Sequence, residues 1–112
     1  MEERVITPWP LHDARPGEIV VVARWKPSPG ERERVLTALS ALTRASSKEP
    51  GCLGYEALHR GDPPDQEIVL IERYADRAAF EEHLASPHFQ RLVLEEIAPK
   101  LRIRQVSVCT ST

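Results

Sequence analysis

The stretch "EIVVVARWK", residues 18–26, constrains the fold more than any other part of the sequence. Its apolar core, "IVVVA", is far shorter than the roughly 20 residues that cross a bilayer. The run is short and rich in β-branched residues, which is typical of a strand buried on both faces. Any fold for this chain must therefore cover both faces of the sheet that contains this strand.

Helix and turn signals divide the rest of the chain. "SPGE" predicts a helix that begins at Pro29 with Ser28 as its cap, and "SSKEPG" predicts the turn that ends it. Asp76 is a candidate cap for a second helix, and Pro87 is placed to end that helix and begin a third. The expected strands are residues 18–26, 52–60, 67–75 and 100–110, and the expected helices are 29–45, 77–86 and 87–99.

This order of strand, helix, strand, strand, split helix, strand predicts an α+β, ferredoxin-like βαββαβ fold. Such a fold has a four-stranded antiparallel sheet with its helices on one face. The second face then stays bare although the first and third strands are apolar on both sides. A second copy of the chain is the simplest cover, so we expect a symmetric homodimer.

We expect one folded domain, residues 18–112, preceded by an extended arm, residues 1–17, in which Pro8, Pro10 and Pro16 remove backbone donors. The formal charge of -2 argues against binding to nucleic acid, which needs a clustered basic excess. No secretory signal begins the chain, so we expect a cytoplasmic protein that does not bind membranes. Cys52 and Cys109 have no metal-ligand spacing and are expected to be reduced.

Three segments, "EPGCLGYEALHR", "IVLIERYADRAAFEEHLASPHF" and "EEIAPKL", resemble the antibiotic biosynthesis monooxygenase (ABM) family of dimeric α+β barrel proteins. The likeness covers about residues 18–108. It implies a cleft between sheet and helices in each subunit and a dimer built on the bare sheet face. The family includes oxygenases that act on aromatic polyketides or quinols with neither metal nor flavin, haem-degrading enzymes, and an isomerase of a phosphorylated, sugar-like signal.

The resemblance, together with the alternation of strand residues, predicts which side chains line the cleft. Glu72 and Tyr74 share one face of the third strand, and Arg73 points the other way. Glu72 and His83 are candidate bases for a phenolic proton, but each has a structural alternative as a buried partner of a neighbouring side chain. The expected catalytic residues are His83, Glu72 and Tyr74, and the expected substrate-binding residues are Trp25, Tyr55, Phe80, His88 and Phe89.

No cofactor is expected. The haem-degrading relatives use an Asn, a Trp and a His at positions that align with Ala23, Tyr74 and about Val93, so the expected helix offers no proximal ligand for the iron. Recruitment of His83 or His88 is the remaining alternative. The four histidines are scattered and show no close pairing with carboxylates, which predicts no metal site.

The favoured function is a cofactor-independent monooxygenase that oxidises a small aromatic or quinol-type molecule with O2. One alternative is an isomerase, or another proton-transfer enzyme, that uses the same cleft. The other is a dimeric small-molecule-binding or stress-response domain without turnover, which a cleft packed solid by Trp25, Phe80 and Phe89 would indicate.

Overall fold

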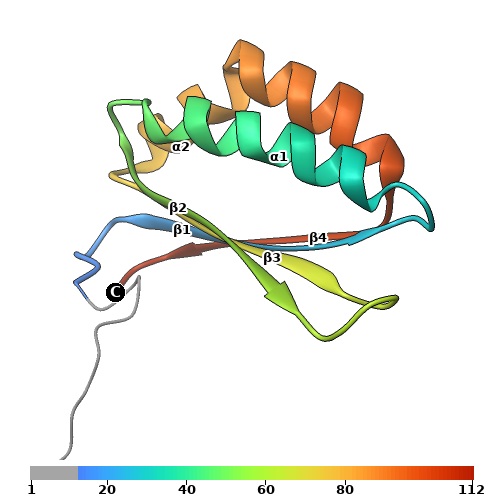
Figure 1. The fold of residues 1–112 in the computed structure, drawn as a ribbon. Helices are drawn as coiled ribbons and strands as arrows, with labels where there is room; N and C mark the ends of the chain where they lie inside the picture. Colours follow the sequence, from blue (N-terminus) through green and yellow to red (C-terminus); the bar gives the residue numbers. More distant parts are fainter. Residues whose placement is uncertain (1–12) are drawn as a thin grey trace, which may run out of the picture.

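The computed structural model describes residues 13–112. Figure 1 shows a sheet with its helices gathered on one side. The elements are β1 (Ile19–Pro27), α1 (Arg32–Ser47), β2 (Cys52–Arg60), β3 (Glu67–Tyr74), α2 (Arg77–Ala85), η1 (Phe89–Ile97), η2 (Ala98–Lys100) and β4 (Leu101–Thr110). The predicted order of strands and helices is confirmed.

The four strands form one sheet in the order β2-β3-β1-β4. All three pairings are antiparallel, with β1 and β3 in the centre. Because consecutive strands β2 and β3 are neighbours while β1 lies between β3 and β4, the topology is that of the ferredoxin-like fold. The predicted fold class is confirmed.

Strand residues alternate between the two faces of the sheet, and the helices bury one of them. Leu70 on β3, Leu42 on α1 and Ile97 on η1 are each 0 % exposed in this layer. On the opposite face, which Figure 1 shows without a helix, Val22 is 38 % and Leu58 42 % exposed. The central strands are thus apolar on both faces, as the sequence indicates, and the chain itself covers only one.

The beginning of α1 differs from the prediction. The helix begins at Arg32 instead of Pro29, and its N-cap, Glu31, makes no side-chain capping bond. Ser28 acts through its backbone, since its carbonyl accepts from the Glu31 amide at 3.0 Å and its amide donates to the Lys100 carbonyl at 2.8 Å. Gly30 has a φ of 82°, which turns the chain before the helix can start.

The helix break after α2 matches its prediction. The Asp76 side chain accepts from the Ala79 amide at 2.8 Å, which is the predicted cap. Ser86 is extended and Pro87 follows it, so α2 ends there and a new helix starts. The new helix was predicted as one continuous α-helix, whereas its main part, η1, has the wider π pattern and its end, η2, is a 3₁₀ turn that contains Pro99.

Most of the predicted N-terminal arm, residues 1–12, lies outside the described residues. Its last part is a turn, with Gly17 at a φ of 90° and its amide bonded to the Ser111 carbonyl at 3.0 Å. Within residues 13–112, no helix is long and apolar enough to span a membrane.

Candidate active site

A cavity of about 50 Å³ lies between the helix-covered face of the sheet and the broken helix. Its lining residues come from all four strands and from α2 and η1: Val21, Ala23, Trp25, Tyr55, Glu72, Phe80, His83, Leu84, Phe89, Val93, Arg104 and Val106. The space suits one or two water molecules, because a water occupies roughly 30 Å³ in the liquid. Small-molecule sites typically measure about 300–1,000 Å³, so a ligand must displace side chains to enter.

Six of the eight predicted site residues meet at this cavity: Trp25, Tyr55, Glu72, Phe80, His83 and Phe89. The other two stand one layer behind it. Tyr74 is 0 % exposed and packs its ring against Phe80 and His83, with ring centroids 5.4 and 5.0 Å apart. His88 lies on the outer side of His83 and borders a separate surface hollow with Pro87 and Arg91.

Glu72 is the buried acid of the cavity, 6 % exposed. Burial raises its pKa to about 7, although the hydrogen bond from Tyr74 opposes this shift. The Tyr74 hydroxyl donates to Glu72 Oε1 at 2.6 Å, and burial raises the pKa of that hydroxyl, so it remains a donor. Arg73 points to the other face, as predicted, where it pairs with Glu18 at 2.8 Å.

Replacement of Tyr74 by Phe should destabilise the fold, because Glu72 then loses its hydroxyl donor while it stays buried. We expect a loss of about 2 kcal/mol in the free energy of unfolding, measured by urea denaturation. In a Glu72→Met background the same replacement should instead stabilise the fold by about 1 kcal/mol, because the buried Tyr74 hydroxyl then has no acceptor and its removal relieves an unsatisfied donor. An equal loss in both backgrounds would show that the hydroxyl matters for another reason.

Glu49 corrects the sequence analysis, which found no carboxylate paired with the histidines. Its Oε2 atom lies 2.8 Å from His83 Nδ1 and 2.5 Å from His88 Nε2. The three ligand-type atoms all lie within 4.8 Å of one another, the separation expected of groups that could hold a metal ion. The premise that the histidines are scattered is therefore wrong, although the absence of a metal itself stays a prediction.

The Glu49 carboxylate decides which imidazole nitrogens carry protons. A carboxylate only accepts hydrogen bonds, so His83 Nδ1 and His88 Nε2 are the protonated atoms of the two rings. The lone pair of a neutral His83 is then on Nε2, which lies 3.7 Å from Glu72 Oε1 at the cavity wall. Burial is the main cause that lowers the pKa of His83, partly offset by its bond to Glu49, and this favours the neutral ring.

Two local features bring this cluster together. At Gly51, a Cβ atom would lie 2.3 Å from Ala79 Cβ, so only glycine lets the turn after α1 come this close to α2. At the helix break, Ser86 Oγ donates to the His83 carbonyl at 2.6 Å and accepts from the Phe89 amide at 3.2 Å. The turn places Glu49, and the break lets His83 and His88 converge from successive helices.

Sequence reasoning missed Glu49 and five residues that line the cavity: Val21, Leu84, Val93, Arg104 and Val106. Alternation places Val21 on the face of Ala23 and Trp25, so strand periodicity could have found it. No local signal marks Glu49, which acquires its role only when the turn packs on α2.

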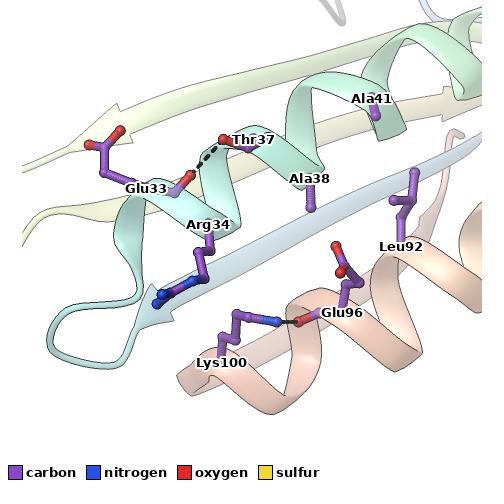
Figure 2. A pocket seen from close by; sticks show the side chains of 8 residues that line it. All are labelled: Glu33, Arg34, Thr37, Ala38, Ala41, Leu92, Glu96 and Lys100. Atoms are coloured by element: carbon purple, nitrogen blue, oxygen red, sulfur yellow. Dashed lines mark hydrogen bonds between the residues drawn. The ribbon is translucent and has the colours of Figure 1, made fainter.

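A second hollow, of about 450 Å³, is an open groove between α1 and the η1–η2 segment (Figure 2). Ala38, Ala41 and Leu92 line it together with charged side chains. Thr37 Oγ1 donates to the Glu33 carbonyl at 2.9 Å, and Lys100 Nζ to the Glu96 carbonyl at 2.8 Å, so these groups bond within their own helical segments. The groove lacks the buried acid and histidine of the cavity.

Comparison with known proteins agrees with this architecture. The family model "Antibiotic biosynthesis monooxygenase" matches residues 18–93. The chain belongs to the antibiotic biosynthesis monooxygenase family. A relative from Mycobacterium tuberculosis, named "Putative monooxygenase Rv0793", is 37% identical over 71 residues, which are 63% of this chain and 68% of that protein. The uncharacterized protein sll1783 of Synechocystis is 27% identical over 90 residues, 80% of this chain and 59% of its own length.

Solved structures of two other proteins share the fold. The structure of Rv0793 has a TM-score of 0.75 at 30% identity and covers 86% of this chain and 96% of its own. Protein SO0527 from Shewanella oneidensis has a TM-score of 0.78 at 27% identity and covers 87% of this chain and 93% of its own. The ABM fold thus extends over nearly the whole described chain.

Proposed function

We propose that this ABM protein is a cofactor-independent monooxygenase that oxidises a small aromatic or quinol-type molecule with O2. The observation that carries the proposal is the geometry of His83: Glu49 holds Nδ1 at 2.8 Å, and Nε2 is left at the cavity beside Glu72. A histidine oriented by a carboxylate in this way is a suitable general base. Tyr55, Phe80 and Phe89 supply aromatic walls.

The reaction needs no external reductant. His83 Nε2 accepts the proton of a quinol hydroxyl, and the resulting anion is electron-rich enough to reduce O2 and bind it at a ring carbon. When the O–O bond breaks, one oxygen atom stays on the ring and the other leaves as water. The substrate supplies the remaining electrons and becomes a hydroxyquinone, so the protein only binds, orients and deprotonates.

The test is oxygen consumption with a panel of dihydroxynaphthalenes and anthrones. We expect oxygen uptake with the protein to exceed the protein-free rate. His83→Gln should reduce this protein-dependent rate about a hundredfold. His59→Gln is the matched control, because His59 is an exposed histidine near the end of β2. Activity should survive EDTA, as expected without a metal cofactor. Uptake that never exceeds the protein-free rate would overturn the proposal.

One observation favours a second candidate, a binding domain without turnover. The cavity of about 50 Å³ is nearly filled by its own side chains. This candidate predicts that naphthols bind, as seen by calorimetry, while oxygen uptake stays at the protein-free rate. We place it second because a filled core gains nothing from a buried acid and histidine at its cavity wall.

We also propose that the protein is a homodimer that packs the bare sheet face of one copy on that of another. Exposed Val22 and Leu58 on this face support the proposal, since a face apolar at its centre is stabilised by burial.

A further inference from the structure

We propose that Glu49, His83 and His88 bind one divalent cation of the Zn²⁺ type, and that this cation switches off His83 as a base. One ligand atom from each residue lies within 4.8 Å of the other two. The contacts of the Glu49 carboxylate point to Glu49 Oε2, His83 Nδ1 and His88 Nε2 as these atoms. The part of the inference that concerns catalysis rests on the proposed function. The binding itself does not.

The donor set is suited to such a cation. Two imidazole nitrogens and one carboxylate are a common set for Zn²⁺ sites that keep a fourth position open for water. Neighbouring ligand atoms around tetrahedral Zn²⁺ are about 3.3 Å apart, given metal–ligand distances of about 2.0 Å. Glu49 Oε2 is 2.8 and 2.5 Å from the two nitrogens, so a cation enters after these atoms separate by less than about 1 Å.

The three ligands are positioned by backbone structure. Glu49 lies in the turn after α1. Its amide donates to the Ser46 carbonyl at 3.1 Å, and its carbonyl accepts from the Cys52 amide at 3.1 Å. His83 lies in the last turn of α2, and His88 comes just after the Ser86–Pro87 break. Sites held by supported backbone bind metals with less reorganisation.

The surroundings also fit a metal site. The second nitrogen of His83, Nε2, lies 3.7 Å from Glu72 Oε1, and metal-bound histidines commonly present their other nitrogen to a carboxylate. The side chains of Glu49 and His88 are 15% and 19% exposed, whereas that of His83 is 2% exposed. A cation can therefore arrive from the outer side, past His88, without passing through the cavity.

Cation binding and base catalysis exclude each other at His83. A metal ion needs the lone pair of Nδ1, so the proton of the neutral ring moves to Nε2. Nε2 then faces Glu72 as a donor and has no lone pair for a substrate proton. His88 likewise binds the cation through the lone pair of Nε2, with its ring proton on Nδ1.

The binding test uses the full chain without an affinity tag, after EDTA treatment and dialysis. Titration with Co²⁺, followed by its visible d–d absorption, and calorimetry with Zn²⁺ should each give one cation per chain. Glu49→Gln and His88→Gln should weaken binding by more than the ~10–100-fold typical of lost outer-shell contacts, and Glu72→Gln by about tenfold. His59→Gln should bind like the parent.

Absence of a saturable site in the parent would overturn the inference, as would equal affinity in Glu49→Gln, His88→Gln and the parent. Circular dichroism and urea unfolding confirm that the variants are folded. The inhibition arm compares oxygen uptake with and without Zn²⁺: the ratio should fall for the parent and stay near one for His88→Gln. If no substrate supports uptake, the proposed function fails, but the Co²⁺ and Zn²⁺ titrations still decide the binding site.

Discussion

Replacement of Gly51 by Ala should cost about 3 kcal/mol in the free energy of unfolding, at the upper end of typical overpacking effects. The new Cβ would lie 2.3 Å from Ala79 Cβ and 3.4 Å from Ala79 Cα, so the turn must move away from α2. The effect is purely steric, because Gly51 does not have a positive φ. Urea unfolding measures the loss of stability. The same substitution should lower the affinity for Co²⁺, because Glu49 moves away from His83.

Two comparisons isolate the clash at Gly51. Gly54→Ala is a matched control on β2, where the nearest heavy atom, Arg73 Cδ, would lie at an ordinary 3.8 Å. Ala79→Gly should lose about 1 kcal/mol alone, through helix propensity, but should restore part of the stability of Gly51→Ala. If the two substitutions are additive, the close contact between turn and helix is not the cause.

Replacement of Val22 by Glu should convert the expected dimer into monomers. Val22 is 38 % exposed at the centre of the bare sheet face, between Ile71 on β3 and Ser107 on β4. In a two-fold interface each substitution occurs twice, so the dimer would have to bury two carboxylates. Burial of unpaired carboxylates is costly, and this cost favours the monomer. Light scattering after gel filtration should give twice the chain mass of 12.6 kDa for the parent and the chain mass for the variant.

Leu94→Glu is the matched control for this experiment. Leu94 is 42% exposed, similar to Val22, but lies on η1 on the helical side of the molecule. The control should remain dimeric. A monomeric parent would contradict the dimer directly, and dissociation of Leu94→Glu alone would place the interface on the helices.

The site places two candidate bases, Glu72 and His83, at the wall of a small cavity. Glu72 lies on β3, whereas His83 lies on α2 together with Phe80 and Leu84, and Phe89 lies on η1 beyond the helix break. Residues 86–88 join α2 to η1, so the helical wall of the cavity is built from two helices that meet at the break.

Local chemistry in the sequence determined most of the fold. The β2 bounds, the Asp76 cap and the opposite orientations of Glu72 and Arg73 follow from alternation, turn residues and capping, which act over a few neighbouring positions. The start of α1 was misplaced because Ser28 uses its backbone, not its hydroxyl, in a turn that Gly30 completes. Six of the eight site residues reached the cavity because strand faces and the helix break are local features.

Tertiary packing decided the rest. Glu49 and His83 are 34 positions apart in the sequence. They meet only because Gly51, which has no Cβ, lets the turn after α1 pack directly against Ala79 of α2. Side-chain contacts at the scale of an ångström set the size of the cavity. They also decide that Tyr74 and His88 lie behind its wall and do not line it. Periodicity specifies the face of an element but not such distances, because distances depend on how all the elements pack together.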